Sequence, residues 1–573
     1  MPPPAEWPLH LKRTTLVDFE AVRRLNVVHD STRELFEAAM KFLYASRFDF
    51  LRTSRTIKAT KMSTEDEERA VRMGKFERCP THYGRRLHDG VHGVNVFTVP
   101  EMKGRRRLIT EPHLSSVIRK EELPQLRSPG RLERRQGLRY AKYMLQIDFE
   151  AFYDAIPLPE ETRDKFVFHT SPEYYLRLKT LPTGARWSVA VGQSITNMIV
   201  DVATEATIYT CIDNIMIAAK AGEEYVFAAA VRAILRRIRQ ANLLTSPDRE
   251  SLLHKSDDEL LRLAQEEQTF LGERFMWNGR ERLVSNSIKT VSKLTLALQA
   301  QRFTCRSFAS LLSLEMYALH TTRMNPAMFF HLLRAYRGVY RLVDQGRPWD
   351  SELSYLDPRV NRTMRDLGAK LTENPWWEIA PAVHVGYEDE RYDCISFTDA
   401  SAEGWGAISR WKDGTAFKYQ QRWMSELGAP EAEDEDELLA RIDPFFFTSK
   451  HSAHAEPAAI LRLLKLMYRR NPRPGQMWAV VTDHIAIVRA QRRQNGYGGM
   501  GRGYALNTLF QYTNALFHEK EIVVVFFYMA GETNPADDLS RHFGETYSAQ
   551  TIESPADDFG VPKLQNGYSP LCE

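Results

Sequence analysis

The alternation of apolar and polar positions changes along the chain and indicates two α/β parts separated by a helical stretch. In the first part, "GVNVFTVPEM" and "KGRRRLITEP" (about 91–112) predict two strands around a turn. "YMLQIDFEAFYDAI" (143–156) predicts a buried strand running into a helix. "TIYTCIDNIMIAA" (207–219) has two β-rich arms, which predict a hairpin with Asp213 near its bend.

Further along, a helix-period pattern follows and then a second α/β pattern. "WSVAVGQSITNMIVDVATEAT" predicts a long helix, and "TFLGERFMW" with "RERLVSN" predicts another hairpin. Residues 289–342 have a helical pattern, and a Pro- and Trp-punctuated stretch after them predicts a connector. From about residue 391, runs such as "CISFTDASAEGWGAISRW", "AEPAAILRLLKLMYRR" and "IVVVFFYMAG" predict alternating strands and helices.

Composition narrows the class of protein. The chain has 573 residues, which suggests about three to four domains, and its 43% hydrophobic and 26% charged content is typical of globular domains. The net charge of +3 does not indicate a polyanion partner, but "KGRRRLI" (103–109) and "RLERRQGLRYAK" (131–142) are basic clusters. These clusters either contact phosphates or form solvated charged faces.

Cysteine usage and hydropathy point to an intracellular protein. The five cysteines are widely spaced and form no CxxC pair, which argues against a disulfide framework or a structural zinc site. The N-terminus lacks the apolar core of a signal peptide, and no run approaches the roughly 18 apolar residues of a membrane span. We therefore expect a cytoplasmic or nuclear location.

Two aspartates in apolar surroundings are candidates for metal chemistry. Asp148 ends a predicted buried strand, and Asp213 lies at a predicted hairpin bend. Side by side, two such carboxylates repel each other, and a hard divalent cation such as Mg²⁺ relieves that repulsion. From composition alone, ordinary turn aspartates are the more common explanation for both.

The order of these segments resembles retroelement reverse transcriptases over roughly residues 90–340. "LQIDFEAFYDAI" resembles their motif A, "LPTGARWSVAVGQ" motif B and "CIDN" motif C, and "TFLGERF" resembles the primer grip. "RRRLI" resembles the fingers motif whose arginine grips the incoming triphosphate. Five such motifs in the family's order indicate a polymerase far more strongly than any one alone.

The resemblance implies roles for particular residues. Metal ligands would be Asp148, the backbone of Phe149, and Asp213, with Asn214 completing the catalytic set. The incoming deoxynucleotide would be bound by a group in which Arg106 is the preferred arginine and Arg107 the alternative: Arg106, Arg107, Lys103, Tyr153, Gly184 and Gln193. Tyr153 would block the ribose 2′-hydroxyl, although it or Phe152 could instead be a core aromatic.

Several positions depart from the family pattern. Motif C has Cys211 where the family usually has Tyr and Asn214 where it has a second Asp. Motif B has Thr183, Val189 and Gly192 at positions often filled by Gln or Met, Pro and Phe. Asn214 offers an amide oxygen without charge, so we expect weaker metal binding or a changed metal preference rather than an inert site.

Four acids in the C-terminal part resemble the metal-binding set of ribonuclease H. They are Asp399 in "TDAS", Glu456 in "HAEPAA", Asp483 in "VTDH" and Asp537 in "NPADDLSR", with Asp538 as the alternative to Asp537. Singly, each is also compatible with a helix cap. Together they imply two metal ions that promote attack of water on the RNA strand of a hybrid. The histidine that many such domains carry is replaced in "YMAGETN" by Ala530 and Gly531.

We therefore expect an α+β polymerase right hand (fingers, palm, thumb) joined to an α/β ribonuclease H-like domain with a mixed sheet. The expected activities are RNA- and DNA-directed DNA synthesis and ribonuclease H cleavage, with two Mg²⁺ or Mn²⁺ ions per active site. The expected partners are RNA template, DNA primer, RNA:DNA hybrid and dNTPs. The predicted domains are an N-terminal extension or fingers (1–90), fingers and palm (91–284), thumb (285–345), connector (346–390), ribonuclease H-like domain (391–545) and tail (546–573).

The sequence also suggests a subfamily and leaves two alternative functions open. "GWGA" and "ADDLSR" resemble tyrosine-recombinase retroelements of the DIRS-like type, with a VIPER-like branch considered and gypsy-type LTR elements next. An inert, domesticated nucleic-acid-binding or scaffold protein is the alternative that the altered motif C favours. An RNA-dependent RNA polymerase is a further alternative, against which Tyr153 and the ribonuclease H-like acids argue.

Overall fold

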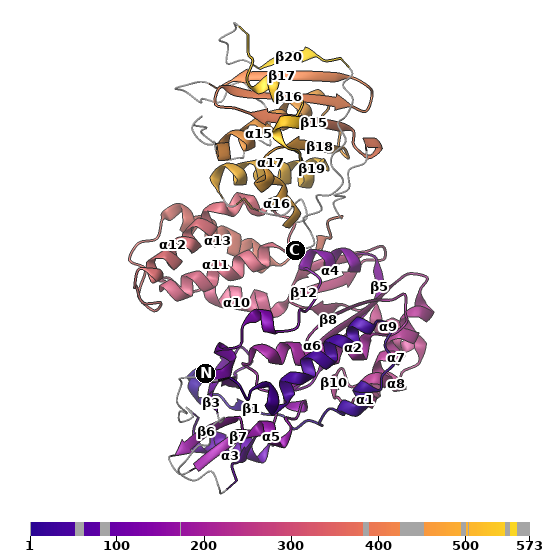
Figure 1. Cartoon of the computed structure of the whole chain (residues 1–573), viewed down its shortest axis with the longest axis vertical. Helices are drawn as coiled ribbons and strands as arrows, with labels where there is room; N and C mark the ends of the chain where they lie inside the picture. The colour runs from indigo at the N-terminus through magenta and orange to yellow at the C-terminus, as the bar shows by residue number, and fades with distance from the viewer. Residues whose placement is uncertain are drawn as a thin grey trace. The chain divides into compact units, whose positions relative to one another are not determined.

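The chain divides into two compact units, Met1–Ser287 and Ile288–Glu573. In this computed structural model the described residues are 2–51, 62–80, 92–171, 174–381, 389–423, 452–493, 500–501, 503–544 and 551–557. Of the predicted tail 546–573, only 551–557 belongs to the described residues. Figure 1 shows the elements of each unit. No helix among these described ranges is long and apolar enough to cross a membrane.

A six-stranded mixed sheet forms part of the first unit. Its order is β1-β4-β3-β6-β7-β2, in which β3 and β4 form the hairpin predicted from the "VNVFTVPEM…RRRLITEP" alternation. β1 is added in parallel beside β4, and β6 in parallel beside β3. The strands are β1 (Leu9–His10), β2 (Phe76–Arg78), β3 (His92–Glu101), β4 (Arg105–Pro112), β6 (Phe166–Ser171) and β7 (Tyr174–Leu178).

A four-stranded antiparallel sheet, ordered β10-β5-β9-β8, carries the first pair of candidate acids. β5 is central because its apolar run is flanked by strands on both sides. A second antiparallel group, β11-β12-β13, follows it in the chain. The strands are β5 (Ala141–Phe149), β8 (Thr207–Cys211), β9 (Asn214–Lys220), β10 (Thr245–Ser246), β11 (Gln268–Phe270), β12 (Glu273–Trp277) and β13 (Arg282–Asn286).

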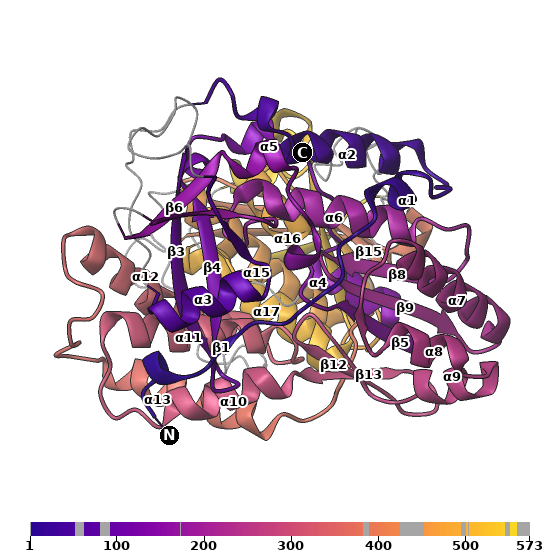
Figure 2. The same cartoon turned by 90° about the horizontal axis from the view of Figure 1, so that it is seen from below.

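Helices cover one side of the four-stranded sheet. α6 packs against β8 and α7 against β9, while α2 runs beside α6 in both views (Figures 1 and 2). α6 ends at Val200, earlier than the sequence pattern predicted. The helices of this unit are α1 (Phe19–Arg23), α2 (Asp30–Met40), α3 (Thr64–Arg72), α4 (Arg131–Leu138), α5 (Glu160–Arg163), α6 (Arg186–Val200), α7 (Glu224–Gln240), α8 (Arg249–His254) and α9 (Asp257–Ala264).

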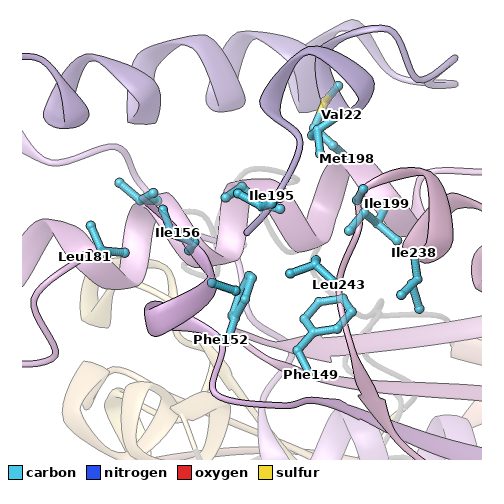
Figure 3. Close-up of a cluster of buried hydrophobic side chains, with 14 of the residues drawn as sticks. Val22, Phe149, Phe152, Ile156, Leu181, Ile195, Met198, Ile199, Ile238 and Leu243 are labelled. Atoms are coloured by element: carbon cyan, nitrogen blue, oxygen red, sulfur yellow. The ribbon is translucent and has the colours of Figure 1, made fainter. Parts of the chain in front are cut away.

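The core between α6 and the sheet is built from side chains far apart in sequence. Phe149 and Phe152 come from the end of β5 and the turn after it, Ile195 and Met198 from α6, and Val22 from α1 (Figure 3). All five are less than about one-twentieth exposed. Val22 belongs to the predicted N-terminal segment 1–90, so described residues of that segment contribute to this core.

The second unit begins with a helical bundle. Its helices are α10 (Ile288–Leu298), α11 (Cys305–Leu319), α12 (Phe330–Asp344) and α13 (Pro358–Glu373), with the short helix η8 (Pro326–Phe329) between α11 and α12. α13 lies within the stretch predicted to be a connector, yet its Met364, Leu367 and Leu371 are buried in the same core as α10 and α11. The segment Pro358–Glu373, within the predicted connector 346–390, is therefore part of the bundle.

A six-stranded mixed sheet, ordered β19-β18-β15-β16-β17-β20, completes the second unit. β15 pairs antiparallel with β16 and parallel with β18, so a long crossover is needed between β15 and β18. α15 and α17 pack on one face. The elements are β15 (Cys394–Ala400), β16 (Gly404–Trp411), β17 (Ala416–Arg422), α15 (Ser452–Arg470), β18 (Met477–Thr482), α16 (Ile485–Arg493), α17 (Tyr504–Lys520), β19 (Val523–Tyr528) and β20 (Ile552–Pro555).

Polar contacts join the bundle to α17. The backbone oxygen of Ala327 in η8 accepts from Asn507 Nδ2 at 2.8 Å and from Gln511 Nε2 at 3.0 Å. Asn325 Nδ2 in turn donates to the Gln511 backbone oxygen at 2.8 Å. Because these groups are buried and paired, the bundle and the mixed sheet are tied together within this unit.

Candidate active sites

The β8–β9 hairpin presents Asp213 on a tight turn. Cys211 and Asn214 are its last paired residues, so Ile212 and Asp213 form the turn. Ile212 has φ of 54°, a left-handed conformation that is unfavourable for a β-branched residue. Such strain persists only where neighbouring groups restrain it.

Helix α6 supplies that restraint. Gln193 Oε1 accepts a hydrogen bond from the Ile212 backbone N–H at 2.7 Å, and Thr196 Oγ1 donates to the Ile212 backbone oxygen. Gln193 Nε2 also donates to Thr210 Oγ1 at 2.9 Å. Gln193 and Thr196 are buried and lie three residues apart, on one face of the helix. The two side chains therefore fix the turn that carries Asp213.

Strand β5 brings Asp148 to the same place. Asp148 is directly opposite Asn214 in the ladder, and the Phe149 backbone N–H donates to the Asp213 backbone oxygen at 2.8 Å. The structure thus brings together Asp148, Phe149, Asp213 and Asn214, which the sequence placed about 65 residues apart. We call Asp148 and Asp213 the first acidic site.

The surroundings of the first acidic site disfavour the charged form of both carboxylates and so raise their pKa values. Partial desolvation raises the pKa of Asp148, and a hydrogen bond from Gln146 and the charge of Lys103 oppose the rise. Solvent reaches Asp213, but crowding by protein and the Asp148 charge still raise its pKa, with Arg107 opposing. Two neighbouring carboxylates whose charged forms are disfavoured suit a divalent cation, because the cation stabilises both negative charges.

Neighbouring acids of the same segment already have cationic partners. Glu150 pairs with Lys12 at 2.6 Å, and Asp154 pairs with Lys75 at 2.5 Å. Lys75 is buried, and both lysines come from the N-terminal region. Of the acids in "DFEAFYD", Asp148 is therefore the one that the structure directs to the first acidic site.

Tyr153 lies beside this site against α6. Burial, with the nearby Asp213 and Cys211, raises the pKa of the Tyr153 hydroxyl to about 12. A Cβ added at Gly192 would lie 3.1 Å from the Tyr153 ring and 3.3 Å from Phe152. Gly192, which departs from the family pattern, is thus where α6 makes room for the two aromatic rings.

The sequence preferred Arg106 as the triphosphate-binding residue, but its guanidinium is already engaged within the first unit. It donates to the Trp7 backbone oxygen at 2.6 Å, to Thr98 Oγ1 at 3.3 Å and to Asp66 at 2.9 Å. The Asp66 pair is mostly buried, so releasing it would cost free energy. The structure therefore gives Arg106 a structural role.

Arg107 and Lys103 are better placed for an anion. Arg107 is 64% exposed and pairs with Glu101 at 2.8 Å, and its charge acts on Asp213. The charge of Lys103, in the turn between β3 and β4, acts on Asp148. Alternation along β4 places Arg107 on the sheet face opposite to Arg106.

Gly184 allows the backbone before α6 to lie close to the backbone of β4. Its N–H donates to the Thr110 backbone oxygen at 2.8 Å, and an added Cβ would lie 2.9 Å from that oxygen. Thr183 and Thr110 exchange two hydrogen bonds beside it. Gly184 therefore joins the start of α6 to the end of β4.

The second unit contains a cluster of three acids, which we call the second acidic site. Asp399 comes from β15, Glu456 from the first turns of α15, and Asp483 follows β18. One carboxylate oxygen from each lies within 4.8 Å of the others. Asp399 and Glu456 are 2% and 4% exposed, so their charges are desolvated as well as mutually repulsive.

Hydrogen bonds orient two of these carboxylates. Glu456 accepts from the Ala400 backbone N–H at 2.8 Å and from Thr482 Oγ1 at 3.3 Å. Asp399 accepts from Ser540 Oγ. Burial, opposed by Ser540, raises the pKa of Asp399 to about 6, and burial with the Asp483 and Asp399 charges raises that of Glu456 well above its usual value. This donor set suits a divalent cation.

Asp537 lies at the edge of the second acidic site. Its charge contributes to the raised pKa values of Asp399 and Asp483, and its carboxylate pairs with Arg541 at 3.1 Å. Of the two neighbouring aspartates, Asp537 is thus the one whose charge is shown to act on this site. Gly531, in the stretch without the histidine, lies close to Asp483, since an added Cβ would be 3.1 Å from its Oδ2.

Supporting residues that were not identified from the sequence include Thr196, Gln146, Ser540 and Thr482. Thr196 and Gln146 lack a recognisable motif, because their roles depend on the tertiary contact of α6 and β5 with the hairpin. Ser540 stands in the "ADDLSR" motif that was used for Asp537, and its spacing was the one available signal.

Paired carboxylates on a hairpin turn and an adjacent strand are typical of metal-dependent phosphoryl-transfer enzymes. Residues 104–275 match the family model described as reverse transcriptase (RNA-dependent DNA polymerase). This segment, which matches the reverse transcriptase domain, contains the whole first acidic site. No curated protein matches the chain.

Solved structures of the foamy viral protease-reverse transcriptase resemble the chain at low identity. Its dRH form in complex with double-stranded DNA has a TM-score of 0.42 and 12% identity, covering 91% of this chain and 83% of that one. Its complex with an RNA/DNA hybrid has a TM-score of 0.40 and 11% identity, covering 97% of this chain and 67% of that one.

Proposed function

We propose that the chain is a retroelement reverse transcriptase that extends a DNA primer on RNA and DNA templates and cleaves the RNA strand of RNA:DNA hybrids. The observation that carries the polymerase proposal is the convergence of Asp148 and Asp213 within a reverse transcriptase domain. The cluster of Asp399, Glu456 and Asp483 supports the nuclease proposal.

In the polymerase reaction, Asp148, Asp213 and the Phe149 backbone oxygen would hold two divalent ions. Such ions, when bound, activate the primer 3′-hydroxyl and stabilise the leaving pyrophosphate. Gln193 and Thr196 fix the turn, so Asp213 needs little reorganisation on binding. The palm in this proposal is the four-stranded sheet with α6 and α7.

Recognition of the incoming dNTP would involve Arg107 and Lys103 as phosphate contacts. The charge of Lys103 acts on Asp148 and that of Arg107 on Asp213. A triphosphate bound between these two cations and the two acids would pair with the cations and would bind the metal ions held by the acids. Tyr153, packed against Gly192, would exclude a ribose 2′-hydroxyl. Gly184 and Gln193 would act indirectly, through the position of α6.

In the nuclease reaction, Asp399, Glu456, Asp483 and Asp537 would hold the ions that activate water for in-line attack on the RNA phosphate. Ser540 and Thr482 orient the carboxylates. The hybrid would be bound mainly through its backbone and shape. The sequence motifs "GWGA" and "ADDLSR" support our proposal of a DIRS-like element.

One observation favours the inert alternative: the second position of motif C is Asn214, whose amide is engaged by Gln146. Primer extension on poly(rA)/oligo(dT) in Mg²⁺ and then Mn²⁺, beside an Asp213→Ala variant, separates the two functions. Extension that Asp213→Ala abolishes supports the polymerase. Absence of extension in both metals, with hybrid binding intact, would favour the binding protein.

A further inference from the structure

Asn214 has a side-chain partner that the sequence did not suggest. Gln146 Nε2 donates to Asn214 Oδ1 at 2.7 Å. In the β5–β9 ladder Asn214 is opposite Asp148, while Gln146 is opposite Met216. The hydrogen bond therefore runs diagonally across the ladder.

The direction of this bond matters for the first acidic site. Gln146 lies further from the hairpin turn than Asp148 does, so it draws the Asn214 amide toward the middle of the strands. Asp213 lies at the turn, on the other side of Asn214 in the chain. The Asn214 amide oxygen is thus engaged by a donor on the side away from Asp213.

Gln146 also lies beside Asp148. The two residues are two positions apart on β5 and point to the same face of the sheet. Asp148 is in turn directly opposite Asn214 in the ladder. The hydrogen-bonded pair of Gln146 and Asn214 therefore lies beside Asp148 on one face of the sheet.

We propose that Gln146 and Asn214 form an uncharged amide bridge that positions Asp148, and that Asn214 does not itself ligate a metal ion. A carboxylate at position 214 would add a third negative charge directly opposite Asp148. The amide bridge instead gives this position an acceptor for Gln146 without added repulsion. Gln146 is a positioning residue, and the proposal rests on the proposed polymerase site.

The test measures metal binding directly, by Mn²⁺ electron paramagnetic resonance titration. Every protein is full-length and carries Asp399→Asn and Asp483→Asn, which keep the second acidic site from contributing. In this parent, Asp213→Ala checks the polymerase site itself. If Asp213→Ala leaves Mn²⁺ binding unchanged, the polymerase site is refuted, and this assignment with it.

The variants are Gln146→Met, Asn214→Leu and the double substitution. Partners that orient a metal ligand typically change metal affinity by about 10- to 100-fold. We expect each single change to weaken Mn²⁺ binding by at least about 10-fold, and the double change to weaken it no further. Gln268→Met is the matched control, because Gln268 Oε1 accepts from the Gln146 backbone N–H, at 3.2 Å, and not from its side-chain amide. We expect the control to keep the parent affinity.

Two results would overturn the proposal. Weaker binding in Asn214→Leu but not in Gln146→Met would make Asn214 a ligand in its own right, as would effects that multiply in the double variant. Unchanged binding in both single variants would remove the bridge from the site altogether. Thermal unfolding confirms that each variant is folded, and Asn214→Ala replaces Asn214→Leu if the larger side chain destabilises the hairpin.

Discussion

Gln193 in α6 accepts a hydrogen bond from the backbone N–H of Ile212 at 2.7 Å, and this contact holds a left-handed isoleucine beside Asp213. Gln193 therefore acts on Asp213 indirectly, through the turn of the β8–β9 hairpin. Its contact explains how a hairpin with an unfavourable residue at its bend keeps one geometry.

Gln193→Met should lower kcat for primer extension by about 10-fold or more while leaving KM for dNTP nearly unchanged, because it disturbs Asp213 rather than a nucleotide contact. Steady-state extension at varied dNTP measures both constants. Thr196→Val should behave similarly, whereas Thr196→Ser, which keeps the hydroxyl that donates to Ile212, should not. A raised KM with normal kcat would instead assign Gln193 to the nucleotide.

Substitution of Arg106 should affect stability, whereas substitution of Arg107 should affect nucleotide binding. Arg107→Ala should raise KM for dNTP by about 10-fold, since it removes one charge-assisted phosphate contact, and should leave the melting temperature unchanged. Arg106→Ala should lower the melting temperature, because it leaves Asp66 buried without its partner. Nucleotide titration and thermal unfolding of both variants test this division. The reverse assignment would restore Arg106 as the phosphate-binding residue.

Tyr153 should control the choice of sugar. Tyr153→Val should increase the ratio of ribonucleotide to deoxyribonucleotide incorporation by roughly 10- to 100-fold, as a pocket that loses a steric block does. Gly192→Ala should impair both substrates, because the new Cβ would lie 3.1 Å from the Tyr153 ring and displace it. Single-nucleotide incorporation with paired substrates measures the ratio. An unchanged ratio in Tyr153→Val would make the residue a core aromatic.

Local patterns predicted the elements that carry the acids. The β-rich arms around "CIDN" predicted the β8–β9 hairpin, and the apolar run before Asp148 predicted β5. Motif order also placed Asp148 with Asp213, and it grouped Asp399, Glu456 and Asp483, whereas Asp537 lies outside that cluster of three. These successes share a cause: each depends on residues adjacent in the chain or on an ordered set of motifs.

Tertiary partners were beyond those patterns. Nothing local to "RRRLI" shows that Arg106 meets Asp66, whereas Arg107 lies on the other face of β4. Likewise, the Pro and Trp residues around α13 suggested a connector, although the apolar spacing of Met364, Leu367 and Leu371 is that of a buried helix face. The Pro and Trp residues that flank α13 were given more weight than the helical spacing of apolar residues within it.

Ser540→Ala should affect the nuclease alone. The serine donates to the buried Asp399 carboxylate, and a hydrogen bond to a charged group contributes about 1.5–3 kcal/mol, so we expect a roughly 10-fold or greater loss of hybrid cleavage. Primer extension, which depends on the first unit, should be unchanged. Ser540→Thr, which keeps the hydroxyl, is the matched control. Equal losses of both activities would indicate general destabilisation instead.

Glu315 should make the stability of the second unit depend on pH. It is fully buried in α11, and burial raises its pKa to about 9, with the charge of Arg365 opposing the rise. The folded state therefore keeps a proton that the unfolded state releases near pH 4.5. Stability is complete below about pH 4.5 and falls as pH rises toward 9, by on the order of 4 kcal/mol at pH 8.

Replacing this carboxyl with an apolar group should remove the dependence. Glu315→Leu should raise the melting temperature at pH 8 and change it little at pH 5, and its stability should vary less between the two. Glu373→Gln, an exposed position on α13, is the control and should follow the parent at both values. Thermal unfolding followed by circular dichroism at pH 5 and pH 8 measures the difference. A parent and a Glu315→Leu variant with the same pH slope would show that the Glu315 carboxyl is solvated or paired with a cation, against the burial seen in the bundle.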